Sequence, residues 1–196
     1  MLLWKRFDDL NVMGKLRLPK NAKLIANEVS VTSTELSTLN GILATSAEIN
    51  RAAKLSTRIV NVTAATLAVT LAAHDGKIIT LNKVDGIAVT LPAAAGTGMK
   101  LQFILGTTIT SVGTTIKVAN SSDTMTGTAI IAQDAGDTVA MFETLAASDT
   151  ITMNGTTTAG IKGDSIELID IATNLWWVRM VGSATGTEAS PFSATV

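Results

Sequence analysis

Residues 75–92 read DGKIITLNKVDGIAVTLP and contain two short apolar segments, each introduced by an Asp-Gly pair. In the second segment Ile87, Val89 and Leu91 alternate with small or polar residues, which is the two-residue period of a strand with one buried face. Asp-Gly is a strong hairpin signal, because a type I′ turn needs positive φ at both central residues. The stretch therefore predicts two strands bounded by tight turns, at 77–82 and 86–91.

The same pattern recurs along the rest of the chain. Short apolar segments punctuated by Gly, Asn and Asp predict further strands. They lie near 58–63, 67–72, 99–105, 115–119, 128–132, 138–144, 150–153, 164–171 and 174–181. Many short strands at this spacing are typical of a sandwich or a barrel. We therefore expect a mainly β domain over residues 56–196, an antiparallel sandwich of jelly-roll-like type or a barrel.

The last of these segments is apolar on both faces. Trp176, Val178 and Met180 point one way along a strand, and Leu175, Trp177 and Val181 the other. A strand that is apolar on both faces is buried on both, so one face is expected to meet another subunit. The candidate residues for the core or an interface of the β domain are Ile87, Val89, Leu91, Phe103, Trp176 and Trp177.

Residues 32–55 carry two helix-start signals. Thr32-Ser33-Thr34-Glu35 and Thr45-Ser46-Ala47-Glu48 are both capping boxes, in which the glutamate reaches back to the start of the helix. Helices this short need a partner in water. The partner is either the same segment of another copy, which we favour, or the β domain of the same chain. The candidate residues for self-association are Leu36, Leu39, Leu43 and Ile49.

Residues 1–31 are expected to form an extended, basic and aromatic arm. Residues 1–23 carry a net charge of +4 and the remainder −5, which favours contact of the arm with an acidic surface. Trp and Arg are enriched at binding hot spots. The alternative is a frayed terminus without a partner. The candidate anchoring residues are Leu2, Leu3, Trp4, Lys5, Arg6, Phe7, Lys15 and Arg17. Few aromatic residues and no nucleic-acid fold signature argue against a nucleic-acid partner.

The composition indicates hidden surface. Hydrophobic residues make up 46% of the 196 residues and charged ones only 16%, below the roughly 25% typical of soluble domains. No apolar run reaches the roughly 18 residues of a membrane span, so we expect no membrane partner. A subunit interface is the expected explanation. The N-terminus lacks the apolar region of a secretory signal, which predicts synthesis in a cytoplasm.

Catalytic and metal-binding patterns are weak. His74 is the single histidine, cysteine is absent, and no Gly-x-Ser-x-Gly occurs. Most carboxylates stand beside Gly or Asn, as turn formers do. The sequence predicts a protein that is not an enzyme and holds no cofactor and no metal. Sugar binding remains as an alternative, with Trp176 and Trp177 as an aromatic platform, although adjacent tryptophans in an apolar strand are more often core.

Two groups of residues resemble a known class of protein. The segment 32–50, with its T-x-x-E-L unit, resembles the linker of tailed-phage fibre and decoration proteins. The strand and turn pattern of DGKIITLN, GIAVTLP and MKLQFIL with GDSIELID and NLWWV is similar to a β domain of phage particle proteins, usually trimeric. The resemblance implies a structural virion protein, made in the cytoplasm of the bacterial host.

The expected role is a homotrimeric decoration, or cement, protein. It would bind the major capsid protein through its arm and stabilise the phage head from its outer surface. The alternative is a short tail-fibre or receptor-binding subunit that recognises a host surface glycan.

Overall fold

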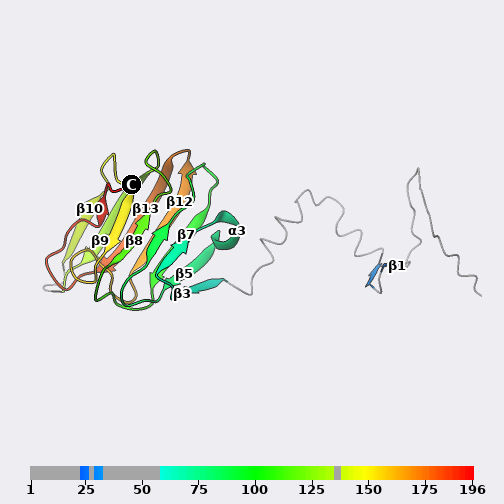
Figure 1. The fold of residues 1–196 in the computed structure, drawn as a ribbon, viewed down its shortest axis with the longest axis horizontal. Helices are drawn as coiled ribbons and strands as arrows, with labels where there is room; N and C mark the ends of the chain where they lie inside the picture. The colour runs from blue at the N-terminus through cyan, green and yellow to red at the C-terminus, as the bar shows by residue number, and fades with distance from the viewer. Residues whose placement is uncertain (1–22, 27–28, 33–57, 135–137) are drawn as a thin grey trace, which may run out of the picture. The chain divides into compact units, whose positions relative to one another are not determined.

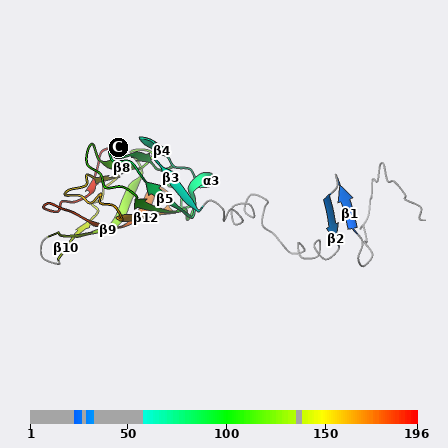
Figure 2. The same cartoon turned by 90° about the horizontal axis from the view of Figure 1, so that it is seen from below.

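The computed structural model of the chain describes residues 23–26, 29–32, 58–134 and 138–196. The chain divides into two units, Met1–Asn50 and Arg51–Val196. In the first unit β1 (Lys23–Ala26) and β2 (Val29–Thr32) form an antiparallel pair, seen in Figure 2. The remainder of the predicted arm and the predicted helical linker lie outside the described residues, and so do all the anchoring and self-association candidates.

The second unit is built from two β-sheets. The larger contains, in spatial order, β10 (Val139–Glu143), β9 (Thr124–Ala132), β13 (Leu175–Ser183), β12 (Ser165–Ala172), β7 (Lys100–Leu105), β5 (Lys77–Leu81) and β3 (Ile59–Val62). The smaller contains β14 (Phe192–Ser193), β11 (Thr150–Met153), β8 (Thr114–Lys117), β6 (Ala88–Thr90) and β4 (Thr66–Ala68). Figures 1 and 2 show the two layers from the face and from below. This mainly β, sandwich-like architecture confirms the predicted fold class.

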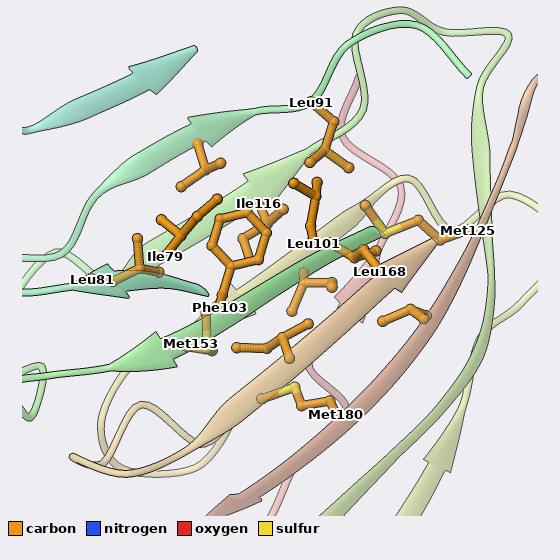
Figure 3. Close-up of a cluster of buried hydrophobic side chains, with 14 of the residues drawn as sticks. Ile79, Leu81, Leu91, Leu101, Phe103, Ile116, Met125, Met153, Leu168 and Met180 are labelled. Carbon is orange, nitrogen blue, oxygen red and sulfur yellow. The ribbon is translucent and has the colours of Figure 1, made fainter. Parts of the chain in front are cut away.

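The core lies between the two sheets. Phe103 and Leu101 of β7 and Met180 of β13 point into it from the larger sheet, and Ile116 and Met153 enter it from the smaller one (Figure 3). All of these side chains are fully buried. Their strands show the alternation of buried and exposed positions that the two-residue period predicts. One apolar face of each sheet is therefore buried by the other sheet.

The sheets are mixed, whereas the sequence analysis expected antiparallel pairing. From β3 to β8 the chain alternates between the two sheets, so each strand pairs with the strand two places along the chain. Such strands run in the same direction, and β3–β5, β5–β7, β4–β6 and β6–β8 are all parallel. A fifth parallel pair joins β13 to β9. Antiparallel neighbours remain where the chain turns back within one sheet, as in β9–β10 and β12–β13.

Both strands predicted within residues 75–92 exist, but they do not pair as the hairpin that the Asp-Gly signal favours. Its first segment becomes β5 of the larger sheet and its second becomes β6 of the smaller one. Gly86 has φ +83°, and a Cβ atom there would lie 2.0 Å from the carbonyl oxygen of Gly113. The Asp85-Gly86 turn thus passes the chain between sheets at a point where only glycine fits.

The Asp75-Gly76 turn has a different context from the expected one. It follows the short helix α3 (Leu71–His74), which replaces the end of the strand predicted at 67–72. The strand itself, β4, ends at Ala68. Leu71 packs against the core, so an apolar residue that suited a strand is buried from a helical turn instead.

Candidate functional site: the outer face of the seven-stranded sheet

The two sheets present different outer faces. On the smaller sheet the register places small and polar side chains in rows across the strands. These residues are Thr66, Ala68, Ala88, Thr90, Thr115, Lys117 and Thr152. No large apolar side chain stands among them. This is the composition expected of a sheet face that meets water.

The outer face of the larger sheet carries large apolar side chains. Ile104, Val181, Ile130 and Met141 lie in one row across β7, β13, β9 and β10, with Ser165 of β12 between the first two. We call these five residues the apolar row. Val181 is 49% exposed and Met141 67%. The row therefore lies on the surface of the unit, open to solvent at its β10 end.

A second apolar group lies toward the other end of the same face. Ile169 of β12 pairs with Trp177 of β13. Leu175, two residues before Trp177, occupies the next outward-facing position of β13. Trp177 is half-buried by its neighbours on the face. Ile171, at the bulge of β12, adds a further exposed apolar side chain. Two apolar areas thus occupy one face.

An ion-pair row separates the two apolar areas. Gln102, Glu167 and Arg179 face one another across β7, β12 and β13. The Lys100 ammonium lies 2.7 Å from one carboxylate oxygen of Glu167, and the Arg179 guanidinium 2.8 Å from the other. The hydrogen bond from Lys100 is the main cause that holds the pKa of Glu167 below its ordinary value. A shallow hollow on the face is lined by Gln102, Glu167 and Arg179 together with Ser165 and Val181.

The structure places the β-domain candidates on two sides of the larger sheet. Ile87, Val89, Leu91, Phe103 and Trp176 lie in the core, each at most 2% exposed. Trp177 alone points outward and belongs to the outer face. The adjacent tryptophans therefore do not form one platform.

Most of the outer face was missed by sequence reasoning. The apolar row comes from five strands in three separate parts of the chain, β7, β9–β10 and β12–β13, and only the register brings these parts together. One signal was available: consecutive apolar pairs such as Ile130-Ile131 place a large side chain on each face of a strand, as Trp176-Trp177 does.

Besides Asp123, whose carboxylate accepts a hydrogen bond from the amide of Ala94, three buried carboxylates bind backbone amides and hold loops in place. Asp170 accepts hydrogen bonds from the amides of Ala95, Gly96 and Thr97 at 2.8–3.2 Å. Asp149 accepts them from Thr195 and Val196 near the C-terminus. Their oxygens are occupied by these donors, so they act as loop anchors rather than as an exposed acid and base.

Asp164 is the third anchor, and its environment differs. It accepts hydrogen bonds from the amides of Gly160, Ile161 and Ser183. Burial nevertheless dominates and raises the pKa of this carboxyl above its ordinary value. Its oxygens point to the backbone of its own loop and of β13, which leaves it no open substrate position.

His74 is a buried helical residue. Its Nδ1 accepts a hydrogen bond from the amide of Thr70 at 3.0 Å. The neighbouring Asp75 accepts one from the amide of Lys100. The Nδ1 of His74 and the carboxylate of Asp75 thus each bind a backbone amide.

Within residues 58–134 and 138–196, with the two short strands of the first unit, no group of three or more His, Asp or Glu side chains is arranged to hold a metal ion. In the same part of the chain, no helix combines the length and apolarity that a membrane crossing requires.

Comparison of the chain with protein-family models, with curated proteins and with solved structures finds no match.

Proposed function

We propose that this chain is a non-enzymatic structural subunit of a tailed-phage particle. In this proposal it is a homotrimeric decoration protein that binds the major capsid protein on the outer surface of the head. The observation that carries the proposal is the apolar outer face of the larger sheet, beside a smaller sheet whose outer face is polar. Such asymmetry is the mark of a protein that works in an assembly. We propose a phage particle as the assembly because the linker and β-domain motifs resemble those of phage particle proteins.

The proposed mechanism is multivalent attachment. The basic arm, residues 2–17, contacts the capsid, while the β domain lies outward. Three arms on one trimer act together, so weak individual contacts give strong overall binding through a high effective concentration. The +4 charge of residues 1–23 supports attraction to an acidic surface.

Deletion of residues 1–17 tests this mechanism. We expect the truncated protein to remain trimeric in light scattering but to fail to co-sediment with phage heads that lack the protein. A matched control is Lys162→Ala, because this exposed lysine belongs to the β domain and its loss leaves the arm charge intact. Decoration of heads by the truncated protein at the full-length level would refute the proposal.

A receptor-binding subunit is the second candidate. One observation favours it: Trp177 is partly exposed on the outer face, where an aromatic ring can stack on a sugar. Trp176 cannot contribute, since it is fully buried. A glycan array probed with the full chain and with Trp177→Ala separates the candidates. Specific glycan signals that vanish in the variant would support receptor binding and count against decoration.

A further inference from the structure

We propose that the outer face of the seven-stranded sheet is covered by other copies of this chain, so that the sheets themselves join the subunits. The inference rests on the proposed function and deepens it, because it names the surface and the occupant of the contact. It also differs from the sequence-based expectation that the helical segment 32–55 holds the copies together.

The first argument is the contrast between the two outer faces. Both sheets belong to one folded unit and meet the same solvent, so the smaller sheet serves as an internal control. Its outer face consists of small and polar side chains, as solvation requires. The larger sheet instead presents the apolar row and the Trp177 group. A difference of this kind points to a covered face.

The second argument is the size of the face. Seven strands spaced about 4.8 Å apart span about 29 Å, and strands of this length extend roughly 20 Å. The face therefore covers roughly 600 Å² in projection. This is the order of the ~800 Å² per partner that a stable interface buries. A small ligand would cover only a part of it.

The third argument is charge. Glu167 binds both Lys100 and Arg179 within the subunit, so these charged groups are already paired when another subunit covers the face. An interface tolerates charges that are paired and hydrogen-bonded. With only 16% charged residues in the chain, the face needs a cover from the time the protein folds. Another copy of the same chain carries an identical face, of the same size and with the same apolar row.

The fourth argument is continuity to the sheet edge. The apolar row ends on β10, which pairs only with β9 among the described strands. Val139, two residues before Met141 on the same face of β10, is 62% exposed. The apolar surface therefore extends to the last strand of the sheet, where neighbouring copies meet when several faces close around one axis.

The test compares two valine variants of the full chain. Val181→Glu places a charge in the apolar row, whereas Val84→Glu places one in the loop between β5 and β6. The two side chains have similar exposure, 49% and 43%, so neither change buries a charge inside the single subunit. We expect Val181→Glu to reduce the mass in light scattering from about three times 20.3 kDa to one, and Val84→Glu to leave it unchanged.

A labelling experiment gives a readout that does not depend on a disruptive variant. The chain has no cysteine, so a single introduced thiol is a clean probe. We expect Val181→Cys in the native oligomer to react with a maleimide at least about tenfold more slowly than Val84→Cys. Equal labelling rates, or a Val181→Glu protein that keeps the full mass, would overturn the inference.

The outcomes separate this inference from the proposed function. A protein that stays trimeric with Val181→Glu but loses head binding on deletion of residues 1–17 retains the proposed function and refutes the sheet contact. A protein that dissociates with Val181→Glu but decorates heads without its arm supports the sheet contact and refutes the arm mechanism. A full-length monomer whose Val181→Cys labels rapidly refutes self-association through this face.

Discussion

Trp176 and Trp177 are neighbours in the chain but lie on opposite faces of β13. Trp176 is fully buried between the sheets, and Trp177 is half-buried on the outer face. The two side chains are chemically identical. The difference in their burial comes only from the pleat, which points neighbouring side chains to opposite faces of the strand.

Alanine substitutions should separate the two tryptophans. Trp176→Ala should lower the free energy of unfolding by about 3–5 kcal/mol, because it leaves a large cavity in the core. Trp177→Ala should cost much less in the subunit and act instead on association. Urea unfolding at low protein concentration checks the first effect, and light scattering checks the second. Equal losses of stability would contradict the assignment.

Asp170 holds the small-residue loop 94–98 against the larger sheet. Burial raises the pKa of its carboxyl, but the hydrogen bonds from Thr97, Gly96 and Ala95 outweigh burial, and the net pKa is lowered. Because the carboxyl titrates at lower pH in the folded than in the unfolded chain, its stabilisation is complete above the unfolded pKa of about 3.9 and is lost as pH falls through the folded pKa.

Asp170→Asn should therefore have a pH-dependent cost. At pH 7 the side-chain NH2 group of the asparagine would face the N–H and O–H of Thr97, which then lose their acceptor. We expect a loss of about 3 kcal/mol in the free energy of unfolding. The loss should shrink below about pH 4, where the carboxyl of the unfolded wild-type chain binds a proton before that of the folded chain and the wild-type advantage falls. Urea unfolding at pH 7 and pH 3 measures both values. Glu143→Gln, at an exposed position of β10, serves as the control, with an expected effect within about 0.5 kcal/mol at either pH.

At the scale of the elements, the parallel pair β9–β13 depends on a close approach. Gly127, whose φ is +150°, lies opposite Val178. A Cβ atom on Gly127 would lie 1.8 Å from the carbonyl oxygen of Val178. Any side chain would push the strands apart. The pair is also the connection through which the β9–β10 hairpin joins the rest of its sheet.

Gly127→Ala should destabilise the fold by about 2–3 kcal/mol, because the added methyl group overpacks the strand contact. Gly98→Ala is a suitable control. Gly98 also has positive φ, but a Cβ atom there would have no neighbour within 4 Å, so only backbone strain of about 1 kcal/mol applies. Thermal unfolding of both variants measures the difference. Equal shifts would mean that the strand contact yields without cost.

At the scale of the whole β unit, the alternation of strands between sheets ties the two layers together. From β3 to β8, successive strands along the chain belong alternately to the larger and to the smaller sheet. Each sheet also supplies one wall of the shared core. Loss of either sheet would therefore expose the core and break the connections of the other.

The β unit should unfold in a single cooperative transition. Urea curves from far-UV circular dichroism and from tryptophan fluorescence should coincide, measured in a Trp4→Phe background so that only Trp176 and Trp177 report. The protein concentration is held constant, since association shifts the midpoint by mass action. Two separated transitions would show that one sheet survives the loss of the other.

Local residue patterns were enough to predict the strands and the core positions. The alternation of Ile87, Val89 and Leu91 predicted a one-sided strand, and the structure buries all three. These features depend on a residue and its near neighbours, which the sequence records directly.

Only the tertiary structure decided which strands pair and what their outer faces assemble. Asp85-Gly86 requires a turn, but the same turn chemistry serves a hairpin or a passage between sheets, because it sets the local φ and not the later partner of the strand. The apolar row likewise joins Ile104, Val181 and Met141 from strands distant in the chain. The two-residue period of each strand determines which of its side chains share a face of that strand. Only the non-local hydrogen-bond register between strands places Ile104, Val181 and Met141 on the same face of the sheet.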